Sequence, residues 1–173
     1  MLKTIWKSKA PLKAIAFSWK LFLDRVPTRN NLAMRSCLPT EESTLCVLCG
    51  RMEESSNHLF LHCVFTEKVW ESVMKWLDFS FITPPNLFVH WTCWSNEGRN
   101  KRIQKGLWMI WHSTIWAIWK ARNHIIFRNE VKYIDELLPE IKVMSWRWSL
   151  SRLSMQTCLY YEWSWNPQEC LMR

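Results

Sequence analysis

The amino-acid sequence predicts a mostly α-helical protein. Only three of its 173 residues are glycine, and 49% are hydrophobic, so the composition favours helices and suffices for a buried core. Hydrophobic residues also recur at helical spacing in several segments. Fourteen tryptophans add large side chains, which ordinarily lie in cores and interfaces.

The first predicted helix covers residues 11–23. Pro11 suits the first turn of a helix, because proline has no amide hydrogen to leave unpaired there. Ile15, Trp19 and Phe22 recur on one face, which predicts that this face packs inward. Lys13 and Lys20 lie outside this face of the helix.

Short elements follow. Pro27 ends the first helix, and Thr28 can cap a second helix that ends near Arg35. Residues 36–45 predict a loop, and the pattern becomes helical again over residues 59–77.

The second half predicts longer helices. One covers residues 100–128, and its middle, residues 107–119, is apolar nearly all round, as in helices buried on several sides. A last helix covers residues 133–155, in which Pro139 predicts a break or a kink. The aromatic tail, residues 157–173, shows no pattern that predicts its secondary structure.

These segments predict three parts of the chain. Residues 1–80 form a small domain stabilised by a metal ion. Residues 81–99 contain Pro84 and Pro85 and few regular signals, so we expect a linker there. Residues 100–173 form a tryptophan-rich helical extension.

One cluster of cysteine and histidine residues predicts the metal site. Cys46 and Cys49 form a C-x2-C pair, and Gly50 allows the positive φ that a tight turn needs. His58 and Cys63 follow, which completes a Cys3His set of the kind that holds structural zinc in a closed tetrahedral shell. His62 is an alternative fourth ligand, because a helix beginning near His58 could direct either side chain at the metal.

The remaining cysteines show no pairing pattern, and we expect them to be unpaired thiols: Cys37, Cys93, Cys158 and Cys170. The total of seven cysteines is odd, and the start of the chain is basic and lacks the apolar run of a signal peptide. Both observations predict a reducing environment. We therefore expect a location inside the cell, the nucleus included, rather than secretion.

No apolar run reaches the roughly 18 residues of a membrane helix, so no membrane partner is expected.

Positive charge is concentrated in two segments. The net charge is +8, and residues 1–35 hold eight basic residues against one acid. Residues 97–128 hold seven basic residues against one acid. Such segments favour polyanionic partners, so we expect RNA or DNA to bind through backbone contacts with little sequence preference. The expected contact residues are Lys7, Lys9, Lys13, Lys20, Arg29 and Arg35.

No catalytic residues are predicted. The chain has three aspartates, Asp24, Asp78 and Asp135, in three different segments, whereas two-metal nucleases and polymerases need clustered acids. Motifs for a hydrolase nucleophile, a phosphate-binding loop or a catalytic zinc are also absent.

Residues 5–78 resemble the zinc-binding domain that follows the reverse transcriptase in plant non-LTR (LINE-type) retrotransposons. The similarity lies in these residues: Trp6, Lys7, Ala10, Pro11, Leu12, Lys13, Phe17, Ser18, Trp19, Lys20, Arg25, Val26, Pro27, Thr28, Asn31, Leu32, Arg35, Cys46, Cys49, Gly50, Glu53, Glu54, His58, Leu59, Phe60, Cys63, Val69 and Trp70. The resemblance implies that His58 and Cys63 complete the metal site. Residues 115–123, with 126–127, resemble the segment that joins this domain to a ribonuclease H domain.

Two functional hypotheses follow. The first is a non-catalytic accessory module of a retrotransposon-derived protein fragment, which binds zinc and nucleic acid and has reverse transcriptase or ribonuclease H domains as protein partners. The alternative is a zinc-stabilised scaffold that docks on a partner through its tryptophan-rich helix 107–119, or a degenerate relic without activity.

Overall fold

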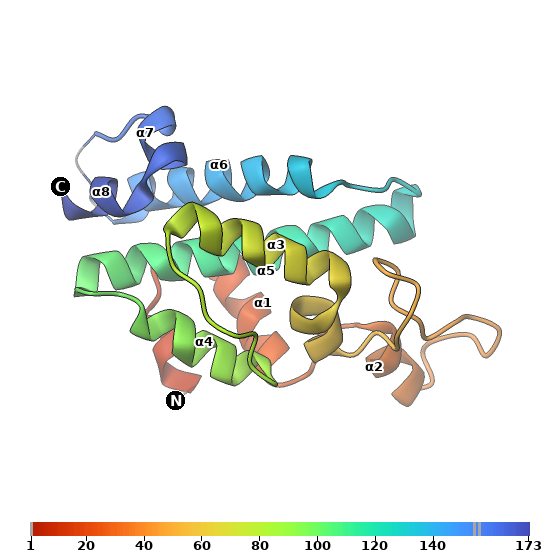
Figure 1. Cartoon of the computed structure of the whole chain (residues 1–173). Coiled ribbons are helices and arrows are strands. Elements are labelled where there is room, and N and C mark those ends of the chain that lie inside the picture. The colour runs from red at the N-terminus through yellow and green to blue at the C-terminus, as the bar shows by residue number, and fades with distance from the viewer. Residues whose placement is uncertain (1, 154, 156) are drawn as a thin grey trace.

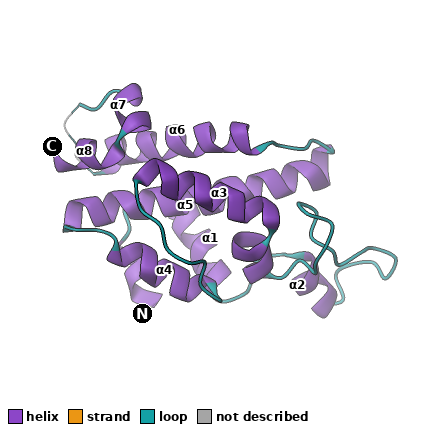
Figure 2. Cartoon of the chain, in the orientation of Figure 1, coloured by secondary structure: helices purple, strands orange, loops and turns teal. Residues whose placement is uncertain are grey.

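The computed structural model describes residues 2–153, 155 and 157–173, and it is built from helices (Figure 1). Their bounds are η1 Leu2–Lys7, α1 Leu12–Phe22, α2 Arg29–Met34, η2 His58–His62, α3 Val64–Leu77, α4 Leu87–Asn96, α5 Lys101–Arg128, α6 Ile134–Arg152, α7 Tyr160–Trp165 and α8 Pro167–Met172. No strand occurs in the described part of the chain (Figure 2), where β pairing is limited to a bridge between Leu45 and Glu53. The predicted helical class is confirmed.

Helix α5 forms the centre of the molecule. It is 28 residues long and contacts α1, α4, α6 and α8. Asn100 caps its first turn by accepting from the amides of Arg102 and Ile103, and Asn129 ends it in a left-handed conformation. The main hydrophobic cluster includes residues from η1 to α8, so the two halves of the chain share one core.

The tryptophan-rich part of α5 is buried rather than presented to solvent. Trp111 is fully buried and stacks on Phe22 of α1, with 5.7 Å between ring centroids. Trp108 and Trp119 are also buried. This burial argues against the hypothesis that the segment 107–119 is a docking surface, because neighbouring helices already cover Trp108, Trp111 and Trp119.

Two buried histidines interact with aromatic and hydroxyl groups of this core. Trp111 Nε1 donates to Nδ1 of His90 at 3.0 Å, and His112 Nδ1 lies 2.8 Å from Ser18 Oγ. Because Ser18 Oγ donates to the carbonyl of Ala14, its lone pair is available to accept from His112. Burial lowers the pKa of both histidines to about 3, so both are neutral in the folded protein at pH 7.

The expected linker contains helix α4, so the expectation of an irregular segment is wrong for residues 87–96. Asn86 caps this helix by accepting from the amide of Val89. Leu87, Trp91 and Trp94 form its buried face, and their spacing is helical. Pro84 and Pro85 precede the helix and lie outside it, so they do not oppose its formation.

The other differences from expectation lie in the C-terminal part. Helix α6 continues through Pro139, which is exposed in the second turn of the helix. Proline cannot donate a backbone hydrogen bond, but the missing bond affects only the exposed first turn.

The unassigned tail forms α7 and α8, and α8 packs against α5 at Gly106. A Cβ atom at Gly106 would lie 2.2 Å from the side chain of Leu171, so only glycine allows this approach.

Cys158 and Cys170 form a disulfide that ties α8 to the segment before α7. The expectation that both would be unpaired thiols is therefore wrong. It failed because Cys170 follows Cys158 by twelve positions in the sequence, and only the fold of the tail brings the two together.

Among the described residues, none of the helices combines the length and the apolar character needed to cross a bilayer.

Candidate metal centre

The first two candidate ligands lie on a tight turn. The amide of Cys46 donates to the carbonyl of Met52, and the amide of Gly50 donates to the carbonyl of Cys46, both at 2.7 Å. Gly50 has a φ of +65°, as its predicted role in the turn requires. The hydrogen bond to the sulfur of Cys63 and burial raise the pKa of the Cys46 thiol, against the backbone amides of Leu48 and Cys49, which point at its sulfur.

The third and fourth ligands lie at the two ends of η2, a π-helical turn. The amide of Cys63 donates to the carbonyl of His58 at 2.7 Å, which is the i→i+5 bond of a π turn. A turn of this width brings residues five apart to the same side of the chain, whereas an α-helical turn would separate them by over a third of a circle. The π turn therefore directs His58 and Cys63 at one point.

Buried side chains hold the π turn in place. Trp70 Nε1 donates to the carbonyl of Phe60 at 2.8 Å, and Thr66 Oγ1 donates to the carbonyl of Leu59 at 2.8 Å. Both carbonyls belong to the segment where the regular backbone hydrogen bonds of a helix are interrupted. Side chains of α3 therefore donate the hydrogen bonds that backbone amides do not supply. Leu59, Phe60 and Leu61 are fully buried, which anchors the turn in the core.

Cys63 is the N-cap residue of α3 and is fully buried. A hydrogen bond from the Cys46 thiol, together with the backbone amides of Phe65 and Thr66, lowers the pKa of Cys63 to about 5 against the effect of burial. A thiolate is favoured at the start of a helix, where free amides and the helix dipole stabilise negative charge. Cys63 is thus prepared to bind a cation.

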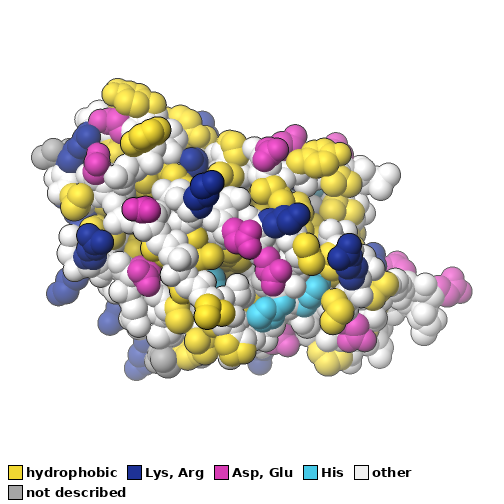
Figure 3. Space-filling model, in the orientation of Figure 1, with side chains coloured by type: hydrophobic (Ala, Val, Ile, Leu, Met, Phe, Trp, Pro, Cys, Tyr) yellow, Lys and Arg dark blue, Asp and Glu magenta, His cyan; other side chains and the backbone are white. Residues whose placement is uncertain are grey.

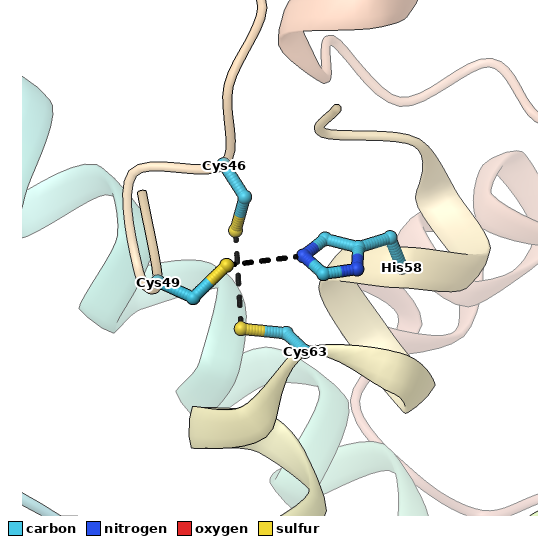
Figure 4. Close-up of side chains that lie close together, drawn as sticks. All are labelled: Cys46, Cys49, His58 and Cys63. Atoms are coloured by element: carbon cyan, nitrogen blue, oxygen red, sulfur yellow. Dashed lines mark hydrogen bonds between the residues drawn. The ribbon is translucent and has the colours of Figure 1, made fainter. Parts of the chain in front are cut away.

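The four side chains converge on one point (Figure 4). Their ligand atoms all lie within 4.8 Å of one another. The sulfurs of Cys46 and Cys63 are 3.9 Å apart, and Cys49 Sγ lies 3.3 Å from His58 Nε2. Zn–S bonds of about 2.3 Å in a tetrahedron place two sulfurs about 3.8 Å apart, so the cluster fits a tetrahedral zinc ion.

His62, the alternative ligand, points elsewhere. Its Nε2 lies 3.2 Å from the carbonyl of Pro85, to which it can donate a hydrogen bond. This contact connects the end of η2 to the segment before α4. The structure thus brings Cys63, and not His62, to the cluster.

The residues expected to contact nucleic acid lie on η1, α1 and α2 or directly beside these elements. Lys7, Lys9, Lys13, Lys20 and Arg35 are exposed. Lys13 Nζ lies 5.1 Å from the centre of the Trp116 ring, in a cation–π contact.

Arg29 differs from these five because its guanidinium is used within the protein. Its Nη1 donates to the backbone carbonyls of Ser43 at 2.9 Å and Leu45 at 3.3 Å. Arg29 thereby holds the loop that leads into Cys46.

The part of the chain that builds this centre also carries a family match. Residues 1–70 match the family described as zinc-binding in reverse transcriptase. This match confirms that residues 1–70 resemble the zinc-binding domain of a reverse transcriptase. No curated protein and no solved structure matched the chain.

The matched zinc-binding domain includes all four ligands, together with α1, α2 and the first half of α3. Three thiolates and one imidazole are a donor set that zinc prefers, and four protein ligands leave no position for a reacting water. Zinc is therefore the cofactor that this centre suits, with Cys46, Cys49, His58 and Cys63 to hold it. When bound, it would cross-link the turn at Cys46 to the π turn.

One pair of residues beside this centre was not predicted from the sequence. Glu54 and Arg122 form a buried ion pair of 2.7 Å that joins the zinc-binding domain to α5. No local pattern in the sequence predicts this pair, because its members are 68 residues apart.

Proposed function

We propose that this chain is a non-catalytic accessory module of retrotransposon origin, in which zinc stabilises a helical fold that binds RNA or DNA through the phosphate backbone. The observation that carries the proposal is the set of exposed cations on and around α1, within the residues that match the family described as zinc-binding in reverse transcriptase. Reverse transcriptase and ribonuclease H domains are the protein partners that this origin suggests.

The cations near α1 are available to a polyanion. Lys13 and Lys20 are seven residues apart, so they extend from the same face of α1, and Lys9 precedes this helix. Within the described residues, none of Lys7, Lys9, Lys13, Lys20 and Arg35 has a carboxylate within ion-pair distance. Binding to phosphate would therefore require no ion pair to break.

The face on which α3 lies has a different charge pattern. Figure 3 shows basic and acidic side chains interspersed on this face. On α3 itself the exposed residues Lys68, Glu71 and Lys75 alternate in charge. A mixed surface attracts a polyanion weakly, which favours the α1 side as the contact surface.

The proposed contacts would discriminate little among sequences. Lysine binds phosphate as a point charge, and α1 contains no asparagine or glutamine for paired hydrogen bonds to a base edge. We therefore assign affinity to counterion release rather than to base recognition.

The positions of the aspartates support a non-catalytic role. Asp24 accepts from Asn31 and Ser56, whereas Asp78 ends α3 and Asp135 lies in the first turn of α6. Within the described residues, neither group of potential metal ligands contains two carboxylates. Two-metal phosphoryl chemistry depends on such clustered acids.

The test measures binding of the zinc-loaded full chain to a fluorescent 30-nucleotide RNA and to the matching DNA duplex, by anisotropy across salt concentrations. We expect the logarithm of affinity to fall linearly with the logarithm of salt concentration. A variant with Lys9, Lys13 and Lys20 all changed to Glu should bind every sequence more weakly. Its salt dependence should also be shallower, by about 0.7 to 0.9 in slope for each phosphate that the variant no longer neutralises.

The matched control changes Lys68, Lys75 and Arg147 to Glu. These residues are exposed outside the proposed surface, and the change in net charge is the same. The control should retain most of the binding. Equally weakened binding in both variants, or no salt-dependent binding by the unmodified chain, would contradict the proposed surface.

A further inference from the structure

We propose that Glu54 and Arg122 form a positioning pair for the zinc site, so that the docking of α5 raises the affinity of the four ligands for zinc. Neither residue is a ligand. The inference rests on the hydrogen bonds that connect this ion pair to the turn carrying Cys46 and Cys49.

Glu54 is fully buried, and its two carboxylate oxygens accept hydrogen bonds from different parts of the chain. Oε2 accepts from the backbone amide of Val47 at 3.3 Å, and Val47 follows Cys46 directly. Oε1 accepts from the backbone amide of Arg29 at 3.0 Å, at the start of α2. One carboxylate therefore connects the ligand turn to the first helical elements of the domain.

Arg122 holds this carboxylate from the middle of the core. Its Nε and Nη2 donate to Oε1 of Glu54 at 3.1 Å and 2.7 Å, and Nη2 also lies 3.3 Å from the carbonyl of Pro27. Its guanidinium carbon lies 4.8 Å from the centre of the Trp119 ring. The side chains of Arg122 and Glu54 are 4% and 0% exposed, so water cannot replace either partner.

Removing one member would leave a buried charge without its partner. Without Arg122, the Glu54 carboxylate would move towards solvent. This movement would disturb its bond to the amide of Val47 and displace the turn that carries Cys46.

The charge of the zinc site adds to this effect. Three thiolates and one zinc ion have a net charge of −1, so the buried Glu54 carboxylate beside the ligand turn disfavours that state unless Arg122 neutralises it. Arg122 therefore acts on the site both by position and by charge.

The test compares zinc affinity with fold stability in the full chain. Zinc affinity is measured by competition with a chromophoric chelator, and stability is measured as the thermal midpoint in excess zinc. Loss of groups that orient metal ligands typically costs about 10- to 100-fold in affinity, and we expect that range for Arg122→Met and for Glu54→Gln. Arg122→Lys retains the charge without the forked geometry and should lose less.

The control variant is Leu137→Ala, which removes a fully buried side chain of α6 and leaves the ion pair intact. We expect it to lower the thermal midpoint while changing zinc affinity less than threefold. If Leu137→Ala and Arg122→Met weaken zinc binding equally at equal loss of stability, the ion pair is only a core contact and the proposal fails.

Cobalt(II) provides a second measurement, which remains informative if Arg122→Met does not fold. The visible d–d absorption of the cobalt-loaded chain reports the geometry of the ligands. In Arg122→Lys we expect a shifted spectrum and faster metal release to a chelator. A spectrum and a release rate identical to those of the unmodified chain would overturn the proposal.

Discussion

His58 and Cys63 direct their side chains at one point because the amide of Cys63 donates to the carbonyl of His58 across a π turn, at 2.7 Å. An ordinary α-helical turn at this position would instead align His58 with His62, four residues on. The choice between the two candidate fourth ligands is therefore made by the hydrogen-bond pattern of the backbone, and Trp70 and Thr66 stabilise that pattern.

Removal of zinc should unfold the region from about residue 40 to residue 75. Structural zinc in small domains contributes on the order of 10 kcal/mol to folding, and the loop before Cys46 contributes few buried side chains. Hydrogen exchange with and without a chelator should show loss of protection at Cys46, Gly50 and Cys63, whose amides are hydrogen-bonded in the turns. Unchanged protection at these amides after chelation would show that the metal is not structural.

Acid should destabilise the fold through His90 and His112. Burial lowers the pKa of each from 6.5 to about 3, so between these values the unfolded chain binds protons that the folded chain does not. The free energy of unfolding should therefore be insensitive to these groups above pH 6.5 and fall as the pH decreases below it. Each histidine contributes a slope of about 1.4 kcal/mol per pH unit.

The variant His112→Gln isolates one of these contributions. Glutamine is neutral at all these pH values and can retain a hydrogen bond to Ser18. Denaturant unfolding in excess zinc, repeated at several pH values, should give the variant a slope shallower by about 1.4 kcal/mol per pH unit. Equal slopes for the two proteins would mean that His112 is protonated in the folded state.

The disulfide between Cys158 and Cys170 should stabilise the C-terminal helices. It closes a loop of twelve residues, for which chain entropy predicts about 3 kcal/mol. Cys170→Ser should lower stability by up to that amount and increase proteolysis after α6. Alkylation under non-reducing conditions, followed by mass spectrometry, should leave these two thiols unmodified, whereas modification of both would show that the bond does not form.

The sequence was sufficient to predict those helices and ligands whose sequence patterns lie within one short segment of the chain. Pro11 and Thr28 marked the starts of α1 and α2, and the apolar middle of α5 indicated its burial. The cysteine and histidine spacing predicted the four residues that the structure brings together. Each of these predictions depends on residues close to one another in the chain.

The remaining features depend on contacts between distant segments. The Glu54–Arg122 pair and the disulfide of the tail join residues that only the fold places side by side. Helix α4 was missed for a different reason, since two prolines before it obscured the helical spacing of Leu87, Trp91 and Trp94. Arg29 has the charge of a phosphate-binding residue, but only the structure shows that it donates to nearby carbonyls.

The most direct test of a zinc centre made by Cys46, Cys49, His58 and Cys63 is the zinc stoichiometry of the purified full chain, measured by native mass spectrometry together with elemental analysis. We expect one zinc ion per chain, lost in Cys63→Ser and retained in His62→Ala, because the π turn directs Cys63 at the other three ligands. A chain purified without chelator that contains no zinc, or a zinc ion that survives Cys63→Ser but not His62→Ala, would contradict this assignment.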